Sequence, residues 1–208
     1  MEVYQISVLK MKKLLGASLL IFIGVLGRTV YHIAPNIEFV TASSLLAGSF
    51  LDFPYAFLVP FAVMVLSDSI LGNTNIFVFT WSAYIIAGLL GLKLRSFRGD
   101  EVGLTFSATS YGALFSFFFF LYTNFGWWFL TSFYPHTLEG LVRCYVAGLP
   151  FLLLNLFGNL IIVPTTFGIV LLGKLIFERA REQKKRPLLI IQDMGSLFSP
   201  THRFVRSS

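Results

Sequence analysis

The sequence predicts an all-α polytopic membrane protein, a single domain with six transmembrane helices. Of its 208 residues, 56% are hydrophobic and 12% are charged, whereas a typical soluble domain carries about 25% charged residues. Apolar segments follow one another along the chain, and a spanning helix needs about 20 such residues. The composition therefore excludes a water-soluble globular domain, and it also excludes a disordered chain, which would have low hydrophobicity.

The six apolar segments each contain at most one charged residue. They cover residues 14–33, 37–51, 54–71, 76–92, 104–122 and 151–173. The second and third are short for a hydrocarbon layer of about 30 Å, so we expect them to tilt or to pack inside the bundle. Pro150 is expected to kink or restart the helix that leads into the sixth segment.

The basic residues predict the orientation. With the amino terminus in the cytoplasm, all of the 16 lysine and arginine residues except Arg28 and Arg143 fall on the cytoplasmic side. Cytoplasmic loops of membrane proteins carry such an excess of positive charge. We therefore predict a multi-pass protein of the cell membrane with both termini cytoplasmic. Its parts are a basic amino terminus (1–13), a six-helix domain (14–177) and a basic tail (178–208).

Small residues recur at every fourth position in two segments. They are Ala83, Ala87 and Gly91 in the fourth segment and Ala108, Gly112 and Ser116 in the fifth. Such faces let helix backbones approach closely in lipid. Two interpretations remain open: packing within the bundle, or docking of another membrane protein.

Polar and aromatic residues gather on the predicted outer side and in the sixth segment, and they predict a ligand site. The candidate ligand-binding residues are Arg28, Asn36, Asp68, Asn124, Trp127, Trp128, Tyr134, Asn155 and Asn159. Aromatic walls with a few amides and charges are typical of small-molecule pockets, and polar groups within a membrane are costly and usually functional. Residues 124–135 are too apolar for a free loop, so we expect a lid or an interfacial loop there.

Each candidate also has a simpler structural interpretation. Trp127, Trp128 and Tyr134 fit the aromatic belt at the headgroup level. Asn155 and Asn159 fit hydrogen bonds between neighbouring helices. Asp68 fits a helix cap or an ion pair with Arg28.

The sequence carries no pattern typical of an enzyme. It lacks H-E-x-x-H, G-x-S-x-G and the Walker-type G-x-x-x-x-G-K-[ST]. Asp52 and Asp68 fall at opposite sides of the membrane in the predicted topology, so they do not form an aspartyl dyad. Cys144 is the only cysteine, which excludes a disulfide within the chain and a cysteine zinc site. We predict no catalytic residue, no cofactor, no metal and no nucleic-acid partner.

Several short motifs between Arg28 and Gly168 carry a resemblance to a known family. They are Pro35-Asn36, Ala47-Gly48, Pro60, Leu66-Ser67-Asp68, Leu71-Gly72, Thr123-Asn124-Phe125-Gly126-Trp127-Trp128, Tyr134-Pro135-x-Thr137, Gly140-Leu141, Cys144-Tyr145-x-Ala147, Leu149-Pro150-Phe151 and Gly158-Asn159. The chain resembles an uncharacterised family of small bacterial membrane proteins. That family is in turn similar to the substrate-binding S components of energy-coupling-factor transporters.

The resemblance implies a six-helix protein that binds a vitamin or trace nutrient from the outer side. Its partners would be the lipid bilayer, the small-molecule ligand and a coupling membrane protein driven by cytoplasmic ATPases. The chain departs from S components at Gly16, Ala17, Gly24 and Gly27, which do not repeat at intervals of four, and at Asn159, where an acidic residue is expected. The alternative function is a non-transporting membrane scaffold that binds other membrane proteins.

Overall fold

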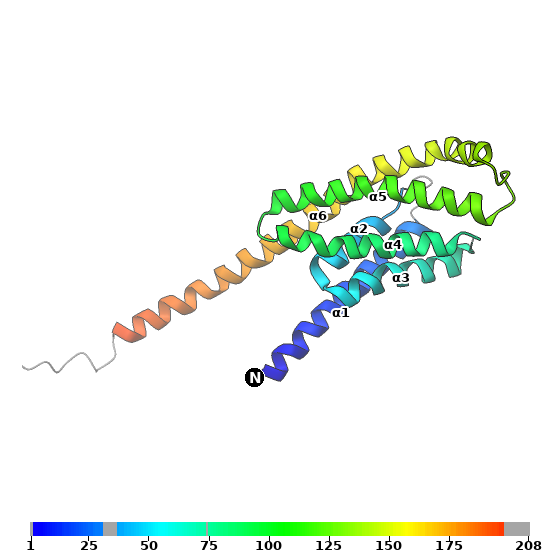
Figure 1. The fold of residues 1–208 in the computed structure, drawn as a ribbon. Coiled ribbons are helices and arrows are strands. Elements are labelled where there is room, and N and C mark those ends of the chain that lie inside the picture. The colour runs from blue at the N-terminus through cyan, green and yellow to red at the C-terminus, as the bar shows by residue number, and fades with distance from the viewer. Residues whose placement is uncertain (1, 31–36, 74, 198–208) are drawn as a thin grey trace, which may run out of the picture. The chain divides into compact units, whose positions relative to one another are not determined.

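The structure is a computed structural model that describes residues 2–30, 37–73 and 75–197, with side chains described within 4–183 of these ranges. The described residues contain helices and no strands (Figure 1). The helices are α1 (Glu2–Thr29), α2 (Val40–Leu46), α3 (Phe53–Leu71), α4 (Phe77–Gly91), α5 (Glu101–Leu130) and α6 (Leu138–Leu197), with a π-helix η1 (Ala47–Leu51) and a 3₁₀-helix η2 (Leu92–Phe97). The all-α prediction is confirmed.

The chain divides into two compact units. The first comprises residues 1–168 and holds α1 to α5 with the first part of α6. The second comprises residues 169–208, and its described part is the remainder of α6. The helix bundle discussed below is the first unit.

Contacts between helices define two ends of the bundle. Near one end, Lys13 of α1 pairs with Asp52, which directly precedes α3. At the other end, Arg28 of α1 pairs with Asp68 of α3, so α1 and α3 run in the same direction. Trp81 near the start of α4 contacts Asp68, and η2 at the far end of α4 contacts Asp52, so α4 runs back. We call these ends the Lys13 end and the Arg28 end; at 1.5 Å per residue along α3 they lie about 24 Å apart.

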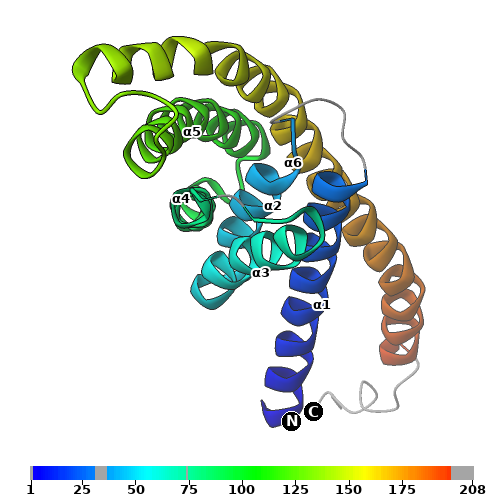
Figure 2. The ribbon, with the colours of Figure 1, turned by 90° about the vertical axis from the view of Figure 1, so that its right-hand side faces the viewer.

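Helix α5 runs opposite to α4, and Figure 2 views both helices from their ends. Phe79 near the start of α4 packs on Tyr122 in the second half of α5, with ring centroids 4.8 Å apart. One turn further along α4, Tyr84 packs on Phe115, with ring centroids 5.5 Å apart. Aromatic side chains therefore fill much of the space between these two helices.

Helix α6 begins at the Arg28 end and runs opposite to α5. The Tyr145 hydroxyl donates to the Leu121 carbonyl at 2.9 Å. Further along, the Asn159 amide donates to the Ser116 hydroxyl at 2.9 Å. Together with the contacts above, these pairs give alternating directions for α3, α4, α5 and the first part of α6.

Helix α2 lies inside the bundle, since all of its residues are buried. The chain through α2 and η1 runs opposite to α1, from Glu38, just before α2 and beside Arg28, to Leu51 of η1 beside Gly16. The second apolar segment therefore packs inside the bundle, which was one of the two expectations for it. Gly48, just after α2, allows a close approach to α4, since a β-carbon there would lie 2.1 Å from the Gly88 carbonyl oxygen.

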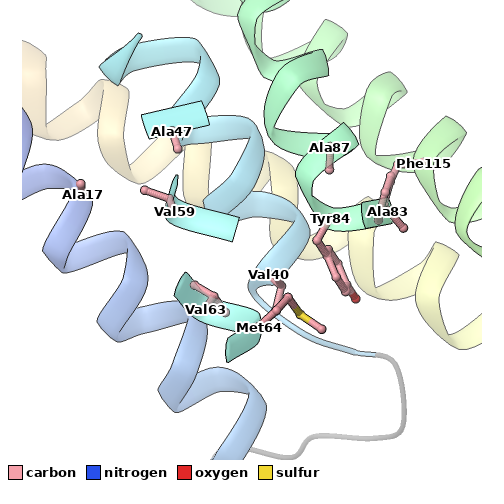
Figure 3. Close-up of a cluster of buried hydrophobic side chains, with 10 residues drawn as sticks. All are labelled: Ala17, Val40, Ala47, Val59, Val63, Met64, Ala83, Tyr84, Ala87 and Phe115. Carbon is pink, nitrogen blue, oxygen red and sulfur yellow. The ribbon is translucent and has the colours of Figure 1, made fainter. Parts of the chain in front are cut away.

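The buried core between α1 and α5 consists largely of small residues (Figure 3). It comprises Ala17, Val40, Ala47, Val59, Val63, Met64, Ala83, Tyr84, Ala87 and Phe115. Large apolar side chains lie instead on the outside of the bundle; for example, Phe106 is 74% exposed and Ile161 is 67% exposed. Small residues inside and large apolar residues outside are the arrangement expected of helices that pack in lipid.

Both faces of small residues are buried, which confirms that they pack within the bundle. Ala83 and Ala87 of α4 are fully buried in the core, as is Ala108 of α5. On α5, a β-carbon on Gly112 would lie 3.0 Å from a methyl group of Val163, so this face contacts α6. These residues do not form an exposed docking face.

Four helices are long and apolar enough to cross a membrane. They cover Phe53–Leu71, Phe77–Phe97, Glu101–Leu130 and Leu138–Gln183. The segment Val40–Leu51 is apolar but shorter than 18 residues. The chain thus has the helix content and apolar character of a membrane protein.

The predicted loop at residues 124–135 is wrong. Helix α5 continues to Leu130, and a turn of only seven residues separates it from α6. The sequence argument ended the helix where about 20 apolar residues would have crossed the bilayer, but backbone hydrogen bonding does not stop at that depth. The helix that holds Pro150 likewise starts at Leu138 and continues through the proline, so it does not restart there.

Candidate functional site

Charged and polar side chains from three helices, α1, α3 and α4, and from the segment just before α2 meet at the Arg28 end of the bundle. We call this group the Arg28 cluster; it comprises Arg28, Glu38, Ser67, Asp68, Trp81 and Tyr84. Arg28 pairs with the Asp68 carboxylate through its Nη1 atom, which also donates to the Ser67 hydroxyl at 2.6 Å. The Arg28 Nε atom lies 3.3 Å from a Glu38 carboxylate oxygen. One guanidinium therefore holds side chains from α3 and from the start of α2.

Two aromatic residues of α4 complete the Arg28 cluster. The Trp81 indole N–H donates to the second Asp68 carboxylate oxygen at 2.6 Å. The Tyr84 side chain hydrogen-bonds Glu38. Since Trp81 and Tyr84 are three residues apart, they lie on one face of α4. Each carboxylate thus forms an ion pair with Arg28 and a hydrogen bond with an aromatic residue of α4.

The charges of the Arg28 cluster are buried. The exposed fractions of the side chains are 16% for Arg28, 14% for Glu38 and 7% for Asp68. One guanidinium and two carboxylates carry a formal charge of −1 at neutral pH. Removing charges from water is expensive unless they are paired and hydrogen-bonded, and the contacts above supply the pairing.

A second polar group lies between α5 and α6. Asn159 donates from its amide nitrogen to Ser116 at 2.9 Å and to the Asn155 amide oxygen at 3.1 Å. Asn155 and Asn159 are 4% and 2% exposed. Asn159 therefore hydrogen-bonds across helices to α5, and within α6 it binds Asn155, so the two asparagines form one buried pair.

Residues between the two polar groups link them through packing. Tyr84 of the Arg28 cluster packs on Phe115 of α5, whose neighbour Ser116 bonds Asn159. Ile37, just before α2, lies against Gly158 of α6. Its Cγ2 atom is 3.2 Å from the position that a β-carbon on Gly158 would take. Tyr84, on the cluster side, and Ile37 therefore make the packing contacts that connect the Arg28 cluster with the helices that carry the asparagine pair.

The aromatic candidates form a third group around the turn between α5 and α6. Trp128 donates from its indole nitrogen to the Pro135 carbonyl at 2.9 Å. Trp127 and Tyr134 both pack on Phe133, with ring centroids 6.3 Å and 5.0 Å away. These contacts stabilise the turn itself.

Asn124 faces α6 rather than the Arg28 cluster. Its amide nitrogen donates to the Phe120 carbonyl one turn back, at 2.8 Å. Its oxygen would lie 2.5 Å from a β-carbon on Gly148. Asn124 is therefore part of the α5–α6 contact. The remaining candidate, Asn36, lies outside the described residues.

The structure adds residues that the sequence argument did not select. Glu38, Ser67, Trp81, Tyr84 and Ser116 all contact a predicted candidate or share its cluster. The signal for two of them was present, since Trp81 and Tyr84 are polar-tipped aromatics within an apolar helix and need buried partners. Among the residues that the structure describes, no group of three His, Cys, Asp or Glu side chains is placed to hold a metal ion.

The described part of the chain is all-helical, with apolar helices of membrane-spanning length around these polar groups. Residues 9–180 match the family of unknown function DUF6580, and the chain belongs to that family. No characterised protein and no solved structure matches the chain.

Proposed function

We propose that the protein spans the membrane with six helices, binds a small nutrient at the Arg28 end and takes part in its uptake. Four helices have the length and apolar character of spans. The alternating directions of the bundled helices and the predicted cytoplasmic position of the basic residues support a nutrient site on the outer side. The bilayer and a small molecule are the partners that this function requires.

The observation that carries this proposal is the Arg28 cluster. Three buried charges sit in a bundle whose other interior residues are mostly small and apolar. Apolar side chains of similar volume would often stabilise a protein as well as a buried ion pair does. Ionisable residues within a membrane mark substrate or ion pathways in most proteins that keep them. We therefore assign the cluster a role in binding.

The pairing of Arg28 restricts the charge of the ligand. Its guanidinium already binds two carboxylates, so an anionic ligand would have to displace one of them. The cluster as a whole has a formal charge of −1, and the Trp81 and Tyr84 rings offer faces that attract cations. We expect a neutral or cationic ligand rather than an anionic one.

The similarity to S components of energy-coupling-factor transporters supports uptake as the wider function. In that class a small helical protein binds a vitamin or trace nutrient, and a coupling membrane protein with cytoplasmic ATPases drives its release. The same partners are proposed for this chain. The alternative, a membrane scaffold, rests on the basic tail, since the small-residue faces are buried within the bundle.

The experiment that tests this function is purification of the tagged protein from its own host in mild detergent. Mass spectrometry then identifies both co-purifying proteins and retained small molecules. We expect a coupling membrane protein with ATPase subunits and an enriched small molecule. Recovery of neither, in repeated and crosslinked preparations, would contradict the proposal.

A matched pair of variants assigns the small molecule to the Arg28 cluster. Asp68→Asn removes the buried carboxylate that binds Arg28, whereas Glu139→Gln removes the exposed carboxylate that binds Arg143 at 2.5 Å. Both variants change an acid to its amide beside an arginine. We expect the small molecule to be lost from Asp68→Asn and kept by Glu139→Gln, with monodisperse protein in both cases.

A further inference from the structure

A second charged cluster lies at the Lys13 end of the bundle, away from the proposed nutrient site. We call it the Asp52 cluster; it comprises Lys13, Asp52, Arg95 and Arg98. The Asp52 carboxylate pairs with Lys13 of α1 through one oxygen and with Arg95 of η2 through the other. Arg98 donates to the Ser49 carbonyl, and its guanidinium lies 5.8 Å from the centre of the Phe50 ring. Cations from two distant segments of the chain, α1 and η2 with the residue after it, are thus gathered around the start of α3.

The Asp52 cluster has more positive charge than its own carboxylate neutralises. Three cations face one carboxylate, which leaves a formal charge of +2. Burial and the neighbouring charge of Arg95 lower the pKa of the Arg98 guanidinium, which shows that the cations repel one another. Arginine nevertheless stays protonated at physiological pH. An anion placed here would relieve this repulsion.

The cluster is within reach of a ligand from outside the bundle. The exposed fractions of the side chains are 28% for Lys13 and 39% for Arg95. Asp52 binds both, so the two cations are held together before any ligand arrives. Preorganisation of this kind reduces the entropy cost of binding.

Large apolar side chains stand next to these cations along the chain. Leu14 and Leu15, which follow Lys13, are 59% and 66% exposed. Phe53, which follows Asp52, is 64% exposed. A free phosphate ion would use only the cations, whereas a phospholipid would also cover the exposed apolar residues with its acyl chains. The surface therefore has the two-part character of a lipid site.

We propose that the Asp52 cluster binds the headgroup phosphate of an anionic phospholipid. The phosphate lies between Lys13, Arg95 and Arg98, and the acyl chains run along the exposed apolar side chains of α1 and α3. This site rests on the membrane-spanning part of the proposed function, but it needs neither the nutrient nor a coupling protein. Asp52 acts as a positioning residue that holds the cations together.

Native mass spectrometry of the full chain tests the proposal. The purified protein is mixed with equal amounts of phosphatidylglycerol and phosphatidylcholine that carry identical acyl chains. We expect a preference for phosphatidylglycerol in the wild type. Since a basic residue near an anionic lipid surface is worth about 1 kcal/mol, Lys13→Gln and Arg95→Gln should each reduce that preference about fivefold.

Control variants separate a defined site from general attraction between charges. Arg143→Gln and Lys174→Gln each remove one exposed basic residue outside the cluster and should leave the preference unchanged. Arg95→Lys keeps the positive charge and should retain most of the preference for phosphatidylglycerol. It therefore keeps the test valid if Arg95→Gln fails to fold. Equal losses in the controls and the cluster variants would overturn the proposal, as would the absence of a preference in the wild type.

The source of the phosphate is tested in the same assay. Added inorganic phosphate at millimolar concentration should leave phosphatidylglycerol bound; displacement of the lipid would show a site for free phosphate and overturn the proposal. A preference for phosphatidylglycerol without any nutrient or ATPase in the purification would contradict only the uptake function. The failures of the two proposals are therefore distinguishable.

Discussion

Arg28 connects α1 with α3 and with the segment just before α2. Its guanidinium binds Asp68 of α3 and Glu38 at the start of α2, and it donates to Ser67 at 2.6 Å. Both carboxylates would remain buried if Arg28 were replaced by a neutral residue. Removing one partner of a buried ion pair lowers the free energy of unfolding by about 3–5 kcal/mol, because the other charge remains buried and unpaired.

We therefore expect Arg28→Gln to lower the thermal unfolding midpoint of the detergent-solubilised protein strongly. Arg143→Gln is the matched control, because Arg143 is 67% exposed and its ion pair lies at the surface. Such exposed pairs contribute about 0–1 kcal/mol. Equal midpoints for the two variants would show that the Arg28 cluster does not stabilise the bundle.

The Asp52 cluster makes a prediction about pH. The hydrogen bond from Lys13, together with the charges of the neighbouring cations, lowers the pKa of the Asp52 carboxyl below its ordinary value of 3.8. A carboxyl with a lowered pKa stabilises the folded state above the unfolded pKa, and this stabilisation is lost as pH falls through the folded pKa. Asp52→Asn should therefore be less stable than the wild type at pH 7.

Thermal unfolding at a series of pH values measures the difference in stability between the wild type and Asp52→Asn. It should be constant above about pH 5, since the carboxyl is then ionised in both states, and it should shrink as pH falls from 3.8 towards the folded pKa. Aspartate and asparagine have nearly the same shape, so the backbone strain at this position, where φ is 84° and ψ is 175°, is common to both proteins and cancels in the comparison. A difference that does not change between pH 7 and pH 3 would contradict the ion-pair explanation.

At the residue scale, the sequence offered the Arg28–Asp68 ion pair as one interpretation, and the structure contains it, but it did not predict the other partners of the candidate residues. Arg28, Asp68, Asn155 and Asn159 were selected because polar groups in apolar segments are costly. Their partners depend on how each helix is rotated about its axis, and no local pattern specifies that rotation. Glu38 was not among the predicted candidates, because its contact with Arg28 requires the segment just before α2 to lie beside α1.

At the scale of helices, the close contact of α4 with α2 and α3 depends on glycine. A β-carbon on Gly88 would lie 2.0 Å from the Ala56 carbonyl oxygen, and a β-carbon on Gly48 would lie 2.1 Å from the carbonyl oxygen of Gly88. Backbone atoms cannot yield as a flexible side chain would. These contacts explain why small residues recur in the fourth apolar segment.

Gly88→Ala is therefore expected to destabilise the protein, because overpacking a buried contact typically costs about 1–3 kcal/mol. Gly168→Ala is the control, since no atom lies within 4 Å of a β-carbon there. Alanine favours a helix over glycine by about 1 kcal/mol, so the control should be neutral or slightly more stable. The thermal unfolding midpoints of both variants check this, and a tolerated Gly88→Ala would refute the close helix contact.

The positions of the apolar segments predicted the helices well, whereas their lengths predicted the helix ends poorly. All six predicted segments fall wholly or mainly on described helices. Helix α5 extends to Leu130 because nothing in the sequence after Tyr122 breaks it, and Gly126 lets it pack closely on Phe79 of α4. A rule based on bilayer thickness limits only the part of a helix that lies in lipid.

At the scale of the whole molecule, the two charged clusters lie at opposite ends of the bundle. Asp52 and Asp68 stand at the two ends of α3, as the predicted topology required. Within the first unit, Lys10, Lys12 and Lys13 of α1 lie towards the Lys13 end, as do Lys93, Arg95 and Arg98 in and just after η2, whereas Arg28 and Arg143 lie towards the Arg28 end. By the positive-inside rule we expect the Lys13 end to face the cytoplasm and the Arg28 end to face the outer side.

Cysteine labelling in intact cells tests this orientation. Ser96 lies in η2 at the Lys13 end and Ser132 lies in the turn between α5 and α6, and both are exposed. In a background in which the buried Cys144 is replaced by alanine, each serine is changed to cysteine in a separate protein. A membrane-impermeant maleimide should label Ser132→Cys in intact cells and label Ser96→Cys only after permeabilisation.

The same two variants test whether α5 crosses the membrane, because α5 is the helix that separates them. Labelling of both from the outside, or of neither, would mean that α5 does not span the bilayer, and the uptake function would then lose its structural basis. The reversed pattern would keep α5 as a span but place the Arg28 cluster on the cytoplasmic side. A nutrient site on that side would serve export or release rather than capture, so this single comparison decides the direction in which the Arg28 cluster could work.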